Sequence, residues 1–164
     1  MYNTNTNRGK VTRYNDGGKH IQTIQHSNTG LELYGMPIFI TDNNNEDVIV
    51  SDSLRGVVVT NRGGIHRFSY TGPSSGVRFL PYGICTDALA HILVCDLYSN
   101  TVHMIDKEGN FLSKILTKQN GISRPRSLSY DFKTHLLWVG SWDDNVVRIY
   151  RYIKRQDLPI LNCN

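Results

Sequence analysis

The stretch Pro81–Asp87 (PYGICTD), followed by Ile92–Asp96 (ILVCD), decides the fold, because its pattern recurs at a fixed distance on either side. The prolines that open the three copies stand at positions 37, 81 and 125, which sets a period of 44 residues. After each proline comes a short segment, then a polar turn, then an apolar run: Val48–Asp52, Ile92–Asp96 or Leu136–Gly140. Internal repeats with a period of roughly 20 to 50 residues are typical of solenoids and propellers.

Each repeat predicts four short β-strands, here called A to D in chain order. Strand A follows the proline, strand B is the apolar run, and strand C follows a polar turn, as in Val57–Thr60, Val102–Ile105 and Val146–Ile149. A turn with glycine, Asn61–Gly64 or Asp106–Gly109, supplies the positive φ that a tight hairpin needs before strand D. Continuously apolar B strands indicate burial on both faces, so neighbouring units must stack.

Four strands in such a period are typical of one blade of a β-propeller. We therefore predict an all-β fold: an incomplete propeller of about three and a half four-stranded blades in an open arc, since a closed ring usually needs about four to eight blades. The propeller is expected over residues 9–155, between a polar tail at 1–8 and a tail at 156–164. The expected units are a half blade at 9–25 and blades at 36–70, 80–117 and 124–153.

Composition narrows the class of protein. A net charge of +4, 39% hydrophobic and 20% charged residues are typical of a soluble globular chain. No apolar segment resembles a signal peptide or is long enough to cross a bilayer, so we expect a cytoplasmic protein. Cys85, Cys95 and Cys163 form no CxxC pair. The first two lie in apolar strand-like runs, where free cysteine acts as a small buried hydrophobe.

The repeats resemble the NHL repeat. The resemblance rests on Ile92–Asp96, Val102 and Asp106–Gly109, and on Val48–Asp52 with Arg55–Val59. The stretch from Thr134 to Tyr152, which contains HLLWVGSW, resembles the carboxyl end of tripartite-motif proteins of the NHL type. Gly140 departs from the pattern, because it stands one period after the aspartates of the earlier repeats.

The resemblance implies a function in recruitment. In that family the propeller is typically six-bladed and binds a protein or an RNA, while ubiquitin-ligase activity resides in an N-terminal RING domain. A RING needs a dense set of Cys and His zinc ligands, which three scattered cysteines do not supply. We therefore expect this chain to be the target-recruiting region of a tripartite-motif ubiquitin-ligase-like protein, and not itself an enzyme.

Strand topology predicts where a partner would bind. In an up-and-down blade the B–C turns and the D–A links lie on one face, and the A–B and C–D turns lie on the other. The first face collects arginines and aromatic residues, which are enriched at binding sites. The predicted partner-binding residues are Arg8, Arg55, Arg78, Phe79, Tyr98, Arg124, Arg126 and Trp142. Tyr82 lies just inside a strand A on the same side, whereas the opposite face is acidic.

Three alternatives concern the partner and the chemistry. A protein target is favoured over RNA, because +4 over 164 residues is a small charge for a nucleic-acid binder. The arc could instead be a structural module that self-associates through its open blade edges. A divergent metal-dependent propeller hydrolase or lyase is the third alternative. No metal ligand or cofactor is predicted, since His91 and His135 share one turn position that Asp47 takes in the previous repeat.

Overall fold

The structure is a computed structural model that describes residues 8–74 and 76–153, and its regular secondary structure is almost entirely antiparallel β-sheet. The predicted tails therefore lie outside the described residues, except for Arg8. The strands are β1 (Val11–Tyr14), β2 (His20–Ile24), β3 (Pro37–Asp42), β4 (Val48–Asp52), β5 (Gly56–Thr60), β6 (His66–Tyr70), β7 (Pro81–Thr86), β8 (Ile92–Asp96), β9 (Thr101–Ile105), β10 (Phe111–Leu116), β11 (Pro125–Asp131), β12 (Leu136–Ser141) and β13 (Val147–Tyr150). One short 3₁₀ helix, Lys118–Asn120, lies between β10 and β11. Within the described ranges, no helix has the length and apolar character to cross a membrane.

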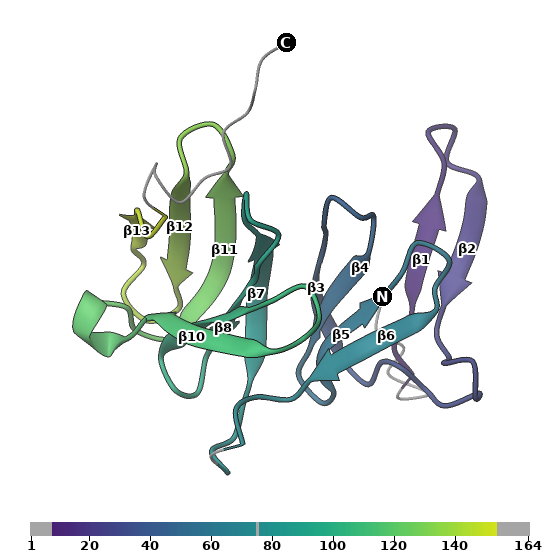
Figure 1. Cartoon of the computed structure of the whole chain (residues 1–164), viewed down its shortest axis with the longest axis horizontal. Coiled ribbons are helices and arrows are strands. Elements are labelled where there is room, and N and C mark those ends of the chain that lie inside the picture. Colours follow the sequence, from purple (N-terminus) through teal and green to yellow (C-terminus); the bar gives the residue numbers. More distant parts are fainter. Residues whose placement is uncertain (1–7, 75, 154–164) are drawn as a thin grey trace.

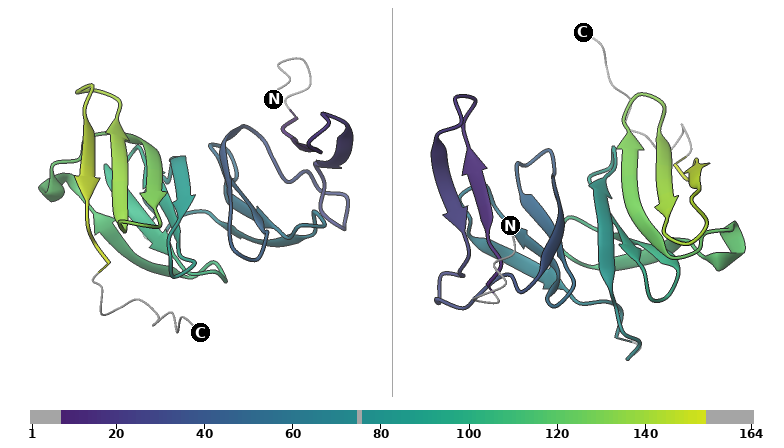
Figure 2. Two further views of the ribbon diagram at one scale, coloured as in Figure 1. Left: turned by 90° about the horizontal axis from the view of Figure 1, so that it is seen from above. Right: turned by 180° about the vertical axis from the view of Figure 1, so that it is seen from behind.

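The strands form four sheets in which chain neighbours pair: β1-β2, β3-β4-β5-β6, β7-β8-β9-β10 and β11-β12-β13. The sheets follow one another in an open arc, from the purple pair β1-β2 at one end to the yellow-green β11-β12-β13 at the other (Figures 1 and 2). Strands β3, β7 and β11 are the first of their sheets, and β7 contacts both of the others. This arrangement confirms the predicted open arc of propeller blades.

The core consists of three apolar layers, one between each pair of successive sheets. Alternate residues of one strand enter different layers: Ile49 packs toward β7-β10, whereas Val48 and Val50 pack toward β1-β2. All five residues of β4, and all five of β8, are buried. Because both faces of these strands are covered, their apolar residues form continuous runs instead of alternating with polar ones.

The first strands of two blades touch through their backbones at Gly83. A Cβ placed on this residue would lie 2.6 Å from the Ser127 Cα and 2.7 Å from the Arg126 carbonyl oxygen. Only glycine allows β7 and β11 to approach this closely. The contact fixes the position of Arg126 relative to Tyr82, the residue that precedes Gly83.

The last blade corrects one detail of the sequence alignment. Tyr130 follows Thr86 by 44 residues, but its partner Leu137 follows Ile92, the partner of Thr86, by 45. An extra residue in the A–B turn therefore shifts strand B, and Ser141, not Gly140, pairs with the opening proline as Asp52 and Asp96 do. The same shift turns Trp138 outward, where 40% of its surface is exposed.

His103 on β9 is a buried ionisable residue that packs against Tyr70 of β6. It is 1% exposed, its ring stacks on Phe79 at 5.3 Å, and its Nδ1 lies 3.0 Å from the Tyr70 hydroxyl. Burial raises the pKa of Tyr70, so this hydroxyl stays protonated and is able to donate a hydrogen bond to Nδ1. Burial lowers the pKa of His103 to about 4, although Asp96 opposes this effect. His103 is therefore neutral at physiological pH.

Candidate partner-binding face

The D–A links and B–C turns lie together because buried aspartates tie them to each other. The Asp52 carboxylate accepts the N–H groups of Gly35 and Met36 in the link, both at 2.8 Å. It also accepts those of Leu54 and Arg55 in the turn, both at 2.9 Å. Asp96 repeats the arrangement one blade later, so the two segments that the topology placed on one face are joined by hydrogen bonds.

The last blade keeps this face without an aspartate. There the Trp142 N–H donates to the Arg124 carbonyl at 3.0 Å, as Leu97 donates to Leu80 at 3.0 Å one blade earlier. Ser141, which replaces the aspartate, accepts instead from the Arg148 guanidinium at 3.4 Å. This backbone bond places Trp142 beside the link that precedes β11.

Four side chains meet at this place and form what we call the arginine–aromatic cluster: Tyr82, Arg124, Arg126 and Trp142. The Arg126 guanidinium carbon lies 3.4 Å from the centroid of the Trp142 ring and 5.6 Å from that of Tyr82. Cation–π contacts of this kind contribute roughly 0.5–1 kcal/mol each at exposed sites. They hold an otherwise mobile arginine at the surface, with its aromatic neighbours supplied by two different blades.

Arg124 is the second cation of the cluster. Its guanidinium carbon lies 5.9 Å from the Trp142 ring centroid, and it forms an ion pair with Asp143 at 3.1 Å. Its backbone has a φ of 39°, which is unfavourable for a residue with a side chain. The Arg124 N–H donates to Asn100 Oδ1 at 2.6 Å, so the B–C turn of one blade holds the strained link of the next. Strained backbone of this kind is often found at functional sites.

A pocket of about 300 Å³ adjoins the cluster. It is lined by Leu80, Leu97, Tyr98, Asn100 and Arg124. Leu97 is buried, whereas Tyr98 is 59% exposed and forms an open wall. The predicted residues Tyr98, Arg124, Arg126 and Trp142 thus form one continuous area, which combines two guanidinium groups, aromatic rings and a small pocket that is partly apolar.

Two other predicted residues lie in a separate area nearer the N-terminus. Arg8 forms an ion pair with Glu32 at 2.8 Å. Glu32 and Arg55 both line a shallow pocket of about 480 Å³ beside β6. The face is therefore divided into two areas in different blades, and the carboxylate of Glu32 lowers the positive charge of this one.

The remaining two predicted residues behave differently from each other. Arg78 is exposed on the link before β7. Phe79 is turned inward, since its ring lies 5.1 Å from that of Tyr70 and stacks on His103 at 5.3 Å. Because it packs against the core, Phe79 presents less surface to a partner than the sequence analysis expected.

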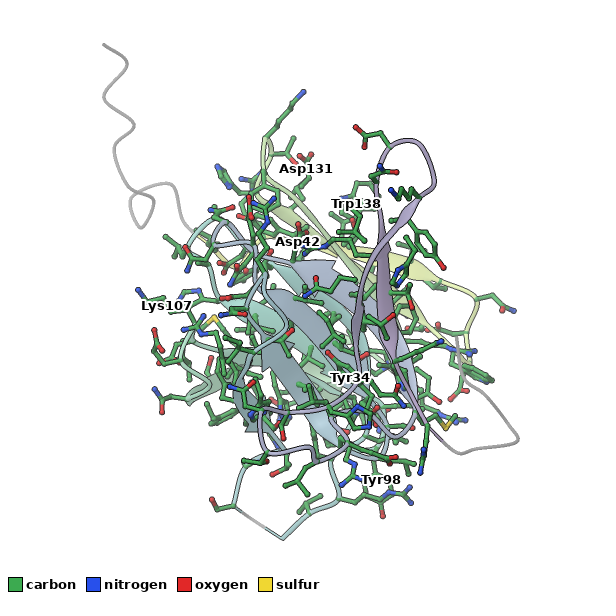
Figure 3. The ribbon with its side chains drawn as sticks, turned by 90° about the vertical axis from the view of Figure 1, so that its right-hand side faces the viewer. Tyr34, Asp42, Tyr98, Lys107, Asp131 and Trp138 are labelled. Carbon is green, nitrogen blue, oxygen red and sulfur yellow. The ribbon has the colours of Figure 1, made fainter. Side chains whose placement is uncertain are left out.

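The opposite face is acidic, and some of its carboxylates form ion pairs with arginines. Figure 3 shows Tyr98 at one end of the molecule, and Asp42 and Asp131 at the other. Arg67 pairs with both Asp47 and Glu108, and Arg62 pairs with Glu46. Asp87 is 1% exposed and accepts the Tyr152 hydroxyl at 2.7 Å. These contacts stabilise the turns, and the ion pairs neutralise part of the charge of the acidic side.

A cavity of about 400 Å³ also opens toward this side, between β3, β7 and β11, and Cys85 lines it. Burial raises the pKa of the Cys85 thiol to about 12, so this residue remains protonated and is a weak nucleophile. Both Cys85 and Cys95 are buried free thiols. Across residues 8–74 and 76–153, no group of three or more His, Cys, Asp and Glu side chains is placed to hold a metal ion.

Sequence reasoning missed Asn100 and Asp143, which position Arg124. Asn100 has a φ of 56°. A signal for its role exists, because asparagine tolerates left-handed backbone and is typical of turns. Nothing in the sequence indicates that its side chain reaches Arg124, which is 24 residues away.

Comparison with known proteins supports the fold, and no protein-family model matches the chain. The chain is 40% identical over 53 residues to protein lin-41 of Caenorhabditis elegans, a match that spans 32% of this chain and 5% of that protein. Among solved structures it is similar to virginiamycin B lyase from Staphylococcus aureus, with a TM-score of 0.61, 20% identity, and coverage of 88% of this chain and 50% of the lyase.

Two further structures have the same fold. A candidate gluconolactonase matches with a TM-score of 0.60 and 17% identity over 89% of this chain and 57% of its own. PorZ of Porphyromonas gingivalis, a surface component of the type-IX secretion system, matches with a TM-score of 0.62 and 14% identity over 78% of this chain and 19% of its own. The chain thus spans about half, or less, of the proteins it matches. Together with the four successive sheets, these likenesses establish the fold as an open arc of a β-propeller.

Proposed function

We propose that this chain is a binding module that recruits a protein through the arginine–aromatic cluster. The observation that carries the proposal is the contact of Arg126 with Trp142 and Tyr82. Arginine, tryptophan and tyrosine are the three residue types that are enriched at binding hot spots. The propeller supplies a rigid frame for this surface, because its blades are locked by buried strands and by the Asp52 and Asp96 carboxylates.

The proposal also includes the cellular context in which this arc acts. The NHL-like repeats, together with the 53-residue likeness to lin-41, support a place in a tripartite-motif protein. In such a protein this arc would select the target, and a RING domain elsewhere would transfer ubiquitin. We also propose a cytoplasmic location and no catalytic activity for the arc itself. The likeness to virginiamycin B lyase, at 20% identity, supports the fold alone and not a shared reaction.

A pull-down of proteins and RNA from cell extract tests the proposed face. The variant Arg124→Glu/Arg126→Glu should lose at least about tenfold in partner recovery, since it replaces both cations of the cluster by anions. The variant Lys107→Glu/Lys133→Glu is the matched control, because it makes the same charge change at exposed positions on the opposite face. Equal recovery by both folded variants would contradict the proposal, and loss only in the control would move the site to the acidic side.

Self-association is a second candidate function, favoured by the outer face of the last blade. Trp138, Val147 and Ile149 are 40%, 62% and 50% exposed on that face. The corresponding residues of the preceding blade, which include Leu93 and Val102, are buried against the next sheet. The proposed occupant is a second copy of the arc, because such a copy presents the same exposed apolar face and two of these faces can cover each other.

Light scattering on the 164-residue chain tests this candidate. A dimer should have about twice the mass of the 18.7 kDa monomer. The variant Trp138→Glu/Ile149→Glu should shift the protein to monomer, since it places charges in the buried interface. Ile65→Glu/Leu112→Glu alters similarly exposed apolar residues of other blades and should leave the mass unchanged. A wild-type protein that stays monomeric up to high concentration would remove this candidate.

A further inference from the structure

The N–H groups of the Arg126 guanidinium are available as hydrogen-bond donors. Its flat face is held against Trp142 at 3.4 Å, which leaves the edge that bears the N–H groups free to bind. Within the part of the chain that the structure describes, no carboxylate forms an ion pair with Arg126. The nearby Asp143 pairs with Arg124 instead, at 3.1 Å. A positioned arginine without an acceptor at the surface is suited to an anion supplied by a partner.

The charge around Arg126 indicates what kind of anion. Arg124, the other cation of the cluster, is neutralised by Asp143, so Arg126 is the cation of the cluster that has no ion pair within the described residues. Nucleic-acid backbones are bound by several cations in a row, since each phosphate contact contributes separately. A single fork of donors flanked by carboxylates matches one isolated carboxylate better than a chain of phosphates.

The adjoining pocket indicates what lies beside that carboxylate. Leu80, Leu97 and Tyr98 form the apolar part of a pocket of about 300 Å³ that Asn100 also lines, and Arg124 borders both this pocket and the Trp142 ring. An apolar side chain next to the anionic one would cover the two leucines and displace water from them. The surface thus has one subsite for an acidic group and one for an apolar group.

We propose that the arginine–aromatic cluster recognises an acidic residue of a protein partner through Arg126, with a neighbouring apolar side chain of the partner in the Leu80–Leu97–Tyr98 pocket. The inference rests on the proposed function and names the chemistry of its partner. The Glu or Asp carboxylate accepts two N–H groups from the guanidinium edge, while Trp142 and Tyr82 keep the guanidinium in place.

Binding of short synthetic peptides, followed by NMR of the tryptophan indole N–H signals, tests this inference. The probe contains one glutamate beside one leucine in a glycine–serine background, and the Trp142 signal is assigned with the variant Trp138→Phe. The glutamate peptide should shift the Trp142 signal, and its glutamine counterpart should bind roughly tenfold or more weakly, as expected for loss of a charge-assisted bidentate pair. A peptide with alanine in place of leucine should also bind more weakly.

Three variants of the protein make the test specific. Arg126→Gln should abolish the preference for glutamate over glutamine. Arg126→Lys should retain only part of it, since lysine keeps the charge but loses the planar fork and the stack. Lys133→Gln removes an exposed cation of the opposite face and should leave binding unchanged. An unchanged preference in Arg126→Gln, or equal binding of the glutamate and glutamine peptides, would overturn the inference.

The outcomes separate this inference from the function on which it rests. If the Arg124→Glu/Arg126→Glu variant loses its cellular partner but the peptides show no dependence on the carboxylate, the binding face stands and its proposed chemistry is wrong. If a short single-stranded RNA shifts the Trp142 signal and the affinity falls steeply with salt, the cluster binds phosphates and the acidic-peptide inference is overturned.

Discussion

Replacement of Asp52 by alanine is expected to lower the free energy of unfolding by about 4 kcal/mol. Its carboxylate is fully buried and accepts four backbone N–H groups, from Gly35, Met36, Leu54 and Arg55. A buried donor left without a partner costs about 1–3 kcal/mol. The donors nearer the surface can reach water, so the expected loss is less than four times the full penalty.

Urea unfolding followed by circular dichroism measures this loss, with Asp106→Ala as the matched control. Asp106 accepts the N–H groups of Glu108 and Asn110 at 2.9 Å and 2.8 Å, but it does so in an exposed hairpin turn. Water can replace those bonds, so the control should lose about 1 kcal/mol or less. Equal losses in the two variants would show that Asp52 does not lock the link to the turn. If Asp52→Ala does not fold, Asp52→Asn keeps one acceptor oxygen and permits the same comparison.

Acidification is expected to destabilise the folded protein through His103 by on the order of 2 kcal/mol between about pH 7 and about pH 4.5. In the folded state burial lowers the pKa of His103 to about 4. In the unfolded chain a histidine has a pKa of about 6.5. Between these two values the unfolded chain binds a proton that the folded state does not, so the free energy of unfolding falls as the pH falls. Below about pH 4 both states are protonated, and this contribution stops growing.

The variant His103→Asn isolates this contribution, because its amide oxygen can still accept the Tyr70 hydroxyl while its side chain does not titrate. Urea midpoints of the two proteins at each pH are compared, so that the titration of carboxylates common to both cancels. The wild type should lose more stability on acidification than the variant. Parallel loss in the two proteins would mean that His103 is protonated in the folded state, or that Tyr70 and Phe79, which pack against it, move apart readily.

The fold was predictable because the same sequence pattern occurs three times along the chain. Proline, polar turn and apolar run recur at 37, 81 and 125, and most predicted strands match the observed ones within one or two residues. The continuously apolar B strands also predicted burial on both faces of the sheet. The period misled at one place: the extra residue in the turn after β11 leaves the prolines in step but shifts β12, so Ser141 and not Gly140 takes the aspartate position.

The candidate site was predictable only in part. Up-and-down topology placed the links and the B–C turns on one face, and this is confirmed by the backbone N–H groups of both segments, which donate to the carboxylates of Asp52 and Asp96. The sequence did not indicate which of the arginines would contact an aromatic ring. Arg8 pairs with Glu32 in one area, whereas Arg126 stacks on Trp142 in another. Phe79 was assigned to the face by its neighbours in the sequence, yet its ring packs inward on His103.

The sequence by itself determined the strands, their order in each blade and the face to which each turn belongs, because these follow from local periodicity and from the direction in which a strand runs. Only the tertiary structure decided the site. Tyr82 and Trp142 belong to different blades, and they flank Arg126 because Gly83 lets the backbones of β7 and β11 touch. Contacts between side chains so distant in sequence depend on how the sheets pack, and no local pattern encodes that distance.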